Sequence, residues 1–312
     1  MNGYTEHLLD GLTGDNPLAF LAAVGTLRAA TQVWSGDSPR MAWRSLSGRW
    51  QPVLRVRRAW SPDELCTDLA QHLSGSLSAL PNWDDVPVAS QEFTALARQA
   101  LHQDAASPGT LDACGWLGSE AEFNGAEEPI RVTHFKMVSG QQSFLEYIRE
   151  LGRVTTDAHL RHALFETWAY ADDKPSLRWD PAEDRRYALR DSNPSDTAKN
   201  PIMTVRGANR LAVEALSLFP VIPACKAPIT RGFFRDESRT NYLTWPIWSD
   251  WTGIDAVRSI LGHRELFSVR PRPDQLRPLG VVEVFRAERT TAYYSNFCPS
   301  RALWGTTTIR QE

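Results

Sequence analysis

The chain has 312 residues, of which 42% are hydrophobic and 23% are charged, a composition typical of an ordered globular protein. Its formal net charge of −3 argues against a protein that coats nucleic acid nonspecifically. No segment approaches the roughly 20 apolar residues of a transmembrane helix, and Asn2, Glu6, His7 and Asp10 interrupt any secretion signal. The four cysteines are at least 48 positions apart, which excludes a C-x-x-C pair and indicates free thiols. We therefore expect a cytoplasmic protein without a membrane partner.

The basic residues are almost all arginines, and most of them lie in the C-terminal part. Only four of the 34 basic residues are lysines. Residues 1–176 contain 14 basic and 22 acidic side chains, whereas residues 177–312 contain 20 basic and 15 acidic ones. The planar guanidinium group suits phosphate, carboxylate and aromatic surfaces, although the codon usage of a GC-rich genome would give the same bias. The C-terminal part is thus the candidate anion-binding part.

The elements predicted first, in chain order, are a strand (7–12), a helix (17–32), two strands (41–46 and 50–57) and a second helix (62–73). Asn16 is a favourable N-cap, and Pro17 fits the first helical turn. Ser61 and Glu64 have the spacing of a capping box for the second helix. The order strand, helix, two strands, helix is typical of the split sheet of a ferredoxin-like unit, although the sequence leaves the strand pairing open.

The rest of the chain also mixes helices and strands. Predicted elements are a helix (89–102), two extended segments (110–117 and 130–138), helices over 140–152 and 157–168, a helix (208–219), extended segments over 221–234 and 242–248, a helix (254–261), a loop (270–278) and a strand (281–294). We expect an α+β fold of mixed small sheets covered by helices. Its predicted parts are an acidic domain (1–171), a polar, arginine-rich loop or linker (172–205) and a basic α+β part (206–312).

Two basic segments are the candidate contacts with nucleic acid. The first contains Arg185, Arg186, Arg190, Lys199 and Arg206, and the second contains Arg231, Arg235 and Arg239 among the aromatic residues Phe233, Phe234, Tyr242, Trp245 and Trp248. Guanidinium groups can neutralise phosphates, while an aromatic ring can stack on an unpaired base. The alternatives are internal pairing of the arginines with nearby carboxylates and burial of the aromatic rings in the core.

A smaller third cluster consists of Arg55, Arg57 and Arg58. Because side chains alternate along a strand, Arg55 and Arg57 should share one face and Arg58 should occupy the other.

The sequence contains little that indicates catalysis. It has no G-x-S-x-G, Walker, G-x-G-x-x-G or H-E-x-x-H motif, and we interpret His159 and His162 as a surface pair. Asp180, Glu183 and Asp184 could hold Mg²⁺ in a nuclease, although the neighbouring arginines would compete for them. We expect a protein that is not an enzyme and needs no metal or cofactor, with a metal-dependent nuclease as the alternative.

Five segments together resemble a known family. They are "GDNPLAFLAAVGTLRA", "FKMVSGQQSFL", "DPAEDRRYAL", "RGANRLAVEALSLFPVIP" and "LTWPIW", and in this order and spacing they resemble type I-G (formerly I-U) CRISPR-associated proteins that are similar to the large subunit of type I effectors. The resemblance implies a noncatalytic subunit of a Cascade-like antiviral complex that binds guide RNA or target DNA and helps to recognise or open the target. Other effector subunits, and the helicase-nuclease that such complexes recruit, would be its protein partners. A pure protein–protein adaptor is the other alternative.

The resemblance also points to individual residues. It assigns Lys136, Gln141, Gln142 and the arginines of "EDRRYALR" to nucleic acid. Gly140, Gln141 and Gln142 would begin a helix, whose free backbone N–H groups favour an anion. Either glutamine could read the edge of a base.

Overall fold

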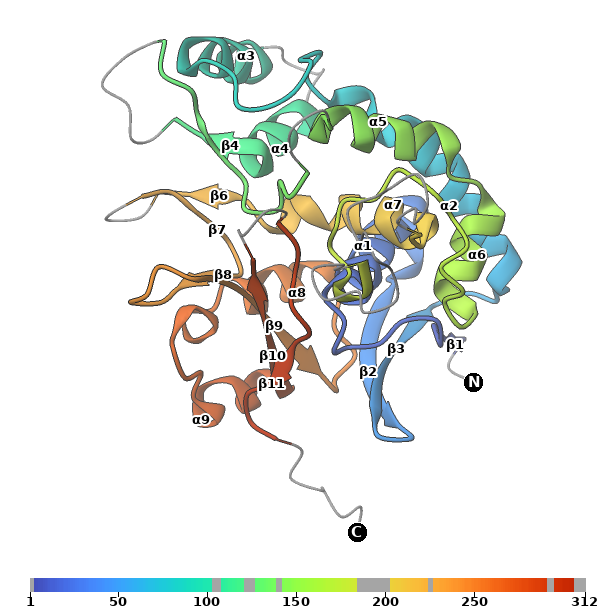
Figure 1. The fold of residues 1–312 in the computed structure, drawn as a ribbon. Coiled ribbons are helices and arrows are strands. Elements are labelled where there is room, and N and C mark those ends of the chain that lie inside the picture. The colour runs from blue at the N-terminus through green and yellow to red at the C-terminus, as the bar shows by residue number, and fades with distance from the viewer. Residues whose placement is uncertain are drawn as a thin grey trace, which may run out of the picture.

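The computed structural model describes residues 3–102, 108–120, 127–138, 142–183, 203–223, 227–290 and 295–305. They form an α+β fold, as predicted (Figure 1). The helices of this part are α1 (Pro17–Val33), α2 (Pro62–Ser76), α3 (Ser90–His102), α4 (Pro108–Leu117), α5 (Phe144–Val154), α6 (Asp157–Phe165), α7 (Arg206–Ala215), α8 (Ile254–Leu261) and α9 (Pro273–Leu276). The strands are β1 (Thr5–Leu8), β2 (Arg40–Leu46), β3 (Arg49–Val56), β4 (Gly118–Ser119), β5 (Arg131–Val132), β6 (Val221–Ile222), β7 (Ile229–Thr230), β8 (Phe233–Arg235), β9 (Asn241–Trp248), β10 (Val281–Arg289) and β11 (Arg301–Ala302).

The N-terminal sheet has the strand order β1-β3-β2 and is antiparallel throughout. Because β1 pairs with β3 and not with β2, the chain must cross the sheet through α1, which gives the split arrangement expected from the element order. Helix α1 begins where the sequence predicts, since the Asn16 side chain accepts hydrogen bonds from the backbone N–H groups of Leu18 and Ala19 at 2.8 and 3.2 Å.

The second large sheet has the order β11-β10-β9-β8 and is also antiparallel. Two tryptophans of β9 are fully buried and tie this sheet to the N-terminal segment. Trp245 Nε1 donates to the carbonyl of Gly14 at 2.8 Å, and Trp248 Nε1 donates to the carbonyl of Met41 at 2.9 Å. Burial of Phe233, Trp245 and Trp248 confirms the core interpretation of these rings.

One main hydrophobic core contains residues from both the N-terminal and the C-terminal parts of the chain. It contains buried residues from Leu9 to Phe297, on either side of the predicted linker. At its centre α1 packs closely against α7, and both helices lie in the middle of the molecule (Figure 1). The contact depends on Gly25, where a Cβ atom would lie 1.8 Å from the carbonyl oxygen of Leu211. No helix within the described ranges combines the length and the apolar character that crossing a bilayer requires.

Several predicted elements differ from the structure. Residues 110–117 are helical in α4 and not extended, because a helix places Ala113, Trp116 and Leu117 together in the interior. Within 130–138 only β5 is a strand, and the predicted loop 270–278 contains the short helix α9. The helix expected over 140–152 begins only at Phe144, with Ser143 as its N-cap.

Candidate nucleic-acid interface

Six of the eleven predicted contact residues lie in the part of the chain that the structure describes. They are Lys136, Gln142, Arg206, Arg231, Arg235 and Arg239. Gln141, Arg185, Arg186, Arg190 and Lys199 lie outside the described residues, as do Gly140 and Asp184.

Lys136 is engaged inside the protein. Its Nζ atom lies 2.8 Å from Asp85 Oδ2 and also donates to the carbonyl of Val86. Asp85 Oδ1 in turn accepts hydrogen bonds from the backbone N–H groups of Phe144 and Leu145 at 2.9 and 3.2 Å. The anion that we expected at the start of this helix is therefore an internal carboxylate. Gln142 lies two residues before α5, so the prediction that it begins the helix is wrong; its side chain accepts from Arg178 at 3.3 Å.

Arg206 is also paired internally. Its guanidinium lies 3.0 Å from Asp173 Oδ1 and contacts His159 Nε2 at 3.0 Å, while its backbone N–H donates to Asp172. These contacts fix the first turn of α7 against α6 and against residues 172–173. His159 of α6 is therefore held by contacts with Arg206 and Asp172.

The two described carboxylates of the nuclease alternative are buried. Asp180 accepts from Asn16 Nδ2 at 3.0 Å and from the Tyr170 hydroxyl at 2.9 Å, and Glu183 accepts from the hydroxyl groups of Ser176 and Thr204. Burial raises the pKa of Glu183 to about 7. Among the residues that the structure describes, no group of three or more His, Cys, Asp and Glu side chains is placed to hold a metal ion.

Arg235 and Arg239 lie on the β8–β9 hairpin, and both are exposed. The turn is closed by Asp236, whose side chain accepts from Ser238 Oγ at 2.7 Å and from the backbone N–H of Thr240 at 2.8 Å. These hydrogen bonds, the one from Ser238 foremost, hold the pKa of Asp236 below its usual value. The turn carboxylate is thus used within the turn, and no carboxylate of the described ranges forms an ion pair with Arg235 or Arg239. Arg239 itself adopts a positive φ of 67° in the turn.

An apolar hollow of about 420 Å³ opens beside this hairpin. It is lined by Ile222, Ile229, Phe233, Phe234, Arg235 and Phe267. Arg235 contributes the charged part of the lining, and the Phe234 ring stacks on Tyr242 with centroids 6.4 Å apart. The hollow therefore offers aromatic surface next to a guanidinium group.

Two further arginines belong to β10, which pairs with β9, and they lie on opposite faces of the sheet. Arg286 is 3% exposed, donates to Thr244 Oγ1 and to the carbonyls of Ser268 and Val269, and lies 4.9 Å from the centre of the Phe234 ring. Asn241 of β9 has Arg289 of β10 as its cross-strand neighbour on one side and Arg235 of β8 on the other. Arg289 Nε and Asn241 Oδ1 are both buried without a hydrogen-bond partner.

These charges raise the electrostatic potential around the hairpin. His134 stacks on Phe233 at 4.9 Å, and burial, with help from Arg289 and Arg235, lowers its pKa to about 4. Burial, and next the nearby Arg301, lowers the pKa of Arg286 to about 10. Arg286 stays charged at neutral pH, and the imidazole of His134 is neutral there.

The arginines of this region share one property: the described residues give them no ion-pair partner. Arg231, Arg235, Arg239, Arg286, Arg289 and Arg301 have no described carboxylate oxygen within 4.0 Å. Arg28, Arg58, Arg161, Arg206 and Arg210 each have at least one. We call the first group, together with the apolar hollow, the hairpin site.

No family model and no curated protein sequence matches this chain.

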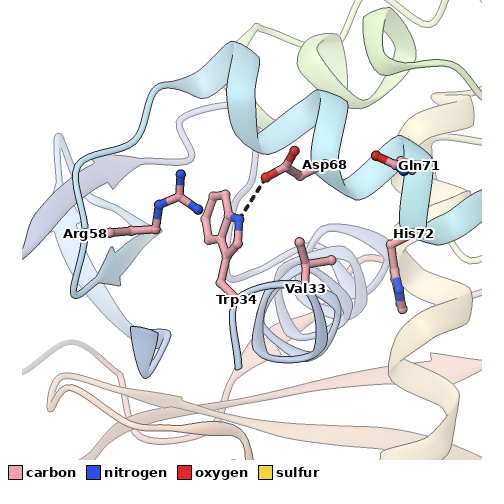
Figure 2. Close-up of a pocket in the computed structure, with 6 residues that line it drawn as sticks. All are labelled: Val33, Trp34, Arg58, Asp68, Gln71 and His72. Atoms are coloured by element: carbon pink, nitrogen blue, oxygen red, sulfur yellow. Dashed lines mark hydrogen bonds between the residues drawn. The ribbon is translucent and has the colours of Figure 1, made fainter. Parts of the chain in front are cut away.

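A second hollow, of about 460 Å³, lies between the end of α1 and helix α2. Figure 2 shows the Trp34 indole between Arg58 and Asp68, to which its Nε1 donates at 2.8 Å. Arg58 lies 5.0 Å from the centre of the Trp34 ring and pairs with Glu64. His72, at the other end of the view, contacts Gln32 at 3.0 Å. Trp34, Asp68, Arg58 and His72 of this hollow each have a partner among the described residues, which favours the hairpin site as the binding surface.

The sequence reasoning missed Arg286, Arg289, His134 and Phe267. Arg286 and Arg289 are both in the segment "EVFRAER", where they are three residues apart and thus on opposite faces of one strand. This spacing predicts that each face of the strand carries one arginine. Nothing in the sequence indicates that the chain brings His134 and Phe267 to the same strand end.

Proposed function

We propose that this protein binds a single strand of nucleic acid at the hairpin site, as a noncatalytic subunit of a type I CRISPR effector complex. The observation that carries the proposal is a group of arginines that form no ion pair with the carboxylates the structure describes, beside an apolar, aromatic hollow. Unpaired guanidinium groups attract phosphates, and aromatic surface accepts bases of any identity.

The residues of the hairpin site have different proposed roles. Arg235 and Arg239 are exposed and neutralise phosphates, whereas Arg231, just before β8, donates to the carbonyl of Leu218. An unpaired base enters the hollow and packs against Phe234 and Phe267. Arg286 is buried and does not reach the strand, but its charge strengthens the field at the surface.

The assembly part of the proposal is supported by the five ordered segments described above. In an RNA-guided complex, base pairing with the guide reads the sequence, so a subunit needs only to hold a strand in place. Guide RNA, target DNA and neighbouring effector subunits are the proposed partners, and the helicase-nuclease that cuts the target would be recruited by the assembled complex.

The test measures binding of labelled single-stranded RNA and DNA by fluorescence anisotropy over a series of salt concentrations. We expect Arg235→Gln with Arg239→Gln to raise the Kd about 10-fold and to lower the slope of log K against log salt by about 1 to 2. Arg98→Gln with Arg153→Gln is the matched control, because both arginines are exposed on helices and have no ion pair to a described residue.

Unchanged affinity of the hairpin variant would remove the site assignment. Copurification tests the assembly: the protein should associate with guide RNA and other effector subunits, and association with the subunits but no crosslink to either strand would favour the adaptor alternative.

A further inference from the structure

A second basic surface lies on the outward face of the β1-β3-β2 sheet. Residues 40–58 contain six arginines and no acidic residue, although the N-terminal part as a whole is acidic. We call the outward side chains Arg40, Arg44, Arg49 and Arg55, with the rings of Tyr4 and Trp251, the arginine face. It uses none of the residues of the hairpin site, and the two surfaces lie on different sheets (Figure 1).

The strand register puts these arginines on one side. Arg40 of β2 lies directly opposite Arg55 of β3, and Arg44 lies opposite Gln51. Residues that are opposite one another in an antiparallel pair share a face. The alternate residues Trp43 and Leu54 point to the other side and are fully buried. The core therefore fixes the orientation of the arginines.

Aromatic rings are interleaved with the guanidinium groups. Thr252 pairs with Met41 through two hydrogen bonds of 3.0 Å, which holds the neighbouring Trp251 at the edge of β2. The Trp251 ring centre lies 4.9 Å from Arg44 Cζ and 4.6 Å from Arg55 Cζ. Arg55 Cζ also lies 4.2 Å from the ring centre of Tyr4. The result is a continuous series of rings and planar cations across the sheet.

The charge of this surface is poorly compensated. Glu6, at 3.7 Å from Arg55, is the acidic partner that the described residues supply, and its side chain is 48% exposed. Arg40, Arg44 and Arg49 have no described carboxylate oxygen within 4.0 Å, and Arg55 Nε is buried without a partner. Like charges directly opposite each other, as in the Arg40 and Arg55 pair, destabilise a sheet. An anion placed over the face would relieve that repulsion.

We propose that the arginine face binds a second segment of single-stranded nucleic acid. Phosphates fit the exposed guanidinium groups of Arg40 and Arg49, and bases stack on the Trp251 ring and on the guanidinium planes. An acidic protein segment would match the charge but would not use the aromatic rings, so the interleaved rings favour nucleic acid. The inference rests on the proposed function for its ligand class, whereas its residues are independent of the hairpin site.

The test compares Arg40→Gln with Arg49→Gln, the hairpin variant Arg235→Gln with Arg239→Gln, and the control Arg98→Gln with Arg153→Gln. The Arg40 and Arg49 side chains are exposed, so the fold should persist; circular dichroism and the unfolding midpoint verify it. For a single-stranded oligonucleotide of about 30 nucleotides, we expect the arginine-face variant to weaken binding about 3-fold to 10-fold and to lower the salt slope. Photocrosslinking with 5-iodouracil in the oligonucleotide should label the peptide that contains Trp251.

The outcomes separate the two proposals. Loss of affinity in the hairpin variant alone, with no label on the Trp251 peptide, overturns the arginine face and leaves the proposed function intact. Loss in the arginine-face variant alone supports this inference and contradicts the hairpin site. If polyglutamate displaces the oligonucleotide from the arginine face at equal charge concentration, the partner is an acidic protein and the inference fails.

Discussion

Glu183 is a buried carboxyl group, and its environment acts on its pKa in two opposite directions. The hydroxyl groups of Ser176 and Thr204 donate to it and favour its charged form, but burial outweighs them and raises its pKa to about 7. Its ordinary pKa is 4.5. Between these two values the folded protein holds a proton that the unfolded chain has released.

This difference predicts a pH dependence of stability. As the pH rises from about 4.5 to about 7, the free energy of unfolding should fall through Glu183, and above that range this contribution should be constant. We expect Glu183→Gln, which is neutral at every pH, to be increasingly stable relative to the unsubstituted protein as the pH rises from 5 to 8. Urea unfolding at several pH values measures the difference, and a difference independent of pH would contradict the prediction.

Single residues also show what the sequence could reveal about the site. The basic character of residues 231–239 is visible in the sequence, and among the described side chains no carboxylate forms an ion pair with these arginines. Lys136 looks equally available, but it pairs with Asp85, which is 51 positions away in the chain. A partner at that separation is supplied by tertiary structure, so the sequence could not distinguish a paired cation from an unpaired one.

At the scale of elements, local signals located some helix starts and failed at others. The N-caps Asn16 and Ser61 are confirmed, because cap, proline and first turn are adjacent in sequence. Helix α5 follows two overlapping patterns, Ser139 with Gln142 and Ser143 with Glu146. The second pattern forms the cap: the Ser143 hydroxyl accepts a hydrogen bond from the backbone N–H of Glu146, and Asp85 accepts one from the backbone N–H of Phe144. Helix α4 was missed because its short apolar run fits both periods.

The shared role of Asp85 gives a prediction for α5. Asp85→Asn keeps an acceptor for the helix N–H groups but removes the negative charge that Lys136 and the helix start both need. We expect the free energy of unfolding to fall by about 1 to 2 kcal/mol. Urea denaturation followed by circular dichroism measures it.

The neighbouring substitution Asp84→Asn is the control, because the structure uses Asp84 through its carbonyl, which accepts from Ser143 Oγ. Equal losses in the two variants would show that Asp85 has no special role.

At the scale of the whole molecule, the main core makes the two ends of the chain depend on each other. Helix α1, from the first part of the chain, packs against α7, which follows the predicted linker. We expect one cooperative unfolding transition for this core and not one transition for each predicted part. The predicted boundaries at 171 and 205 follow changes in composition, which carry no information about such packing.

Gly25 provides the test of this cooperativity. A Cβ atom on Gly25 would collide with the backbone of Leu211, so Gly25→Ala must push α1 and α7 apart. We expect a loss of at least about 3 kcal/mol in the free energy of unfolding, with the whole transition shifted as one. Calorimetry and circular dichroism should report the same midpoint.

Gly75, in helix α2, has open space around its Cβ position and serves as the matched control. Gly75→Ala should leave stability unchanged or raise it by up to about 1 kcal/mol, because alanine is the better helix former. A split transition in the Gly25→Ala variant would contradict the single cooperative unit.

The pairing of Met41 with Thr252 has one more effect. A strand edge with free N–H and C=O groups can recruit a strand from another chain and so start aggregation. In the N-terminal sheet, β2 is a long outer strand, and the Thr252 segment occupies part of its edge. The other outer strands of the two large described sheets, β1, β8 and β11, have four, three and two residues. Edges as short as these give a second molecule little to pair with, which makes the described sheets poor templates for aggregation.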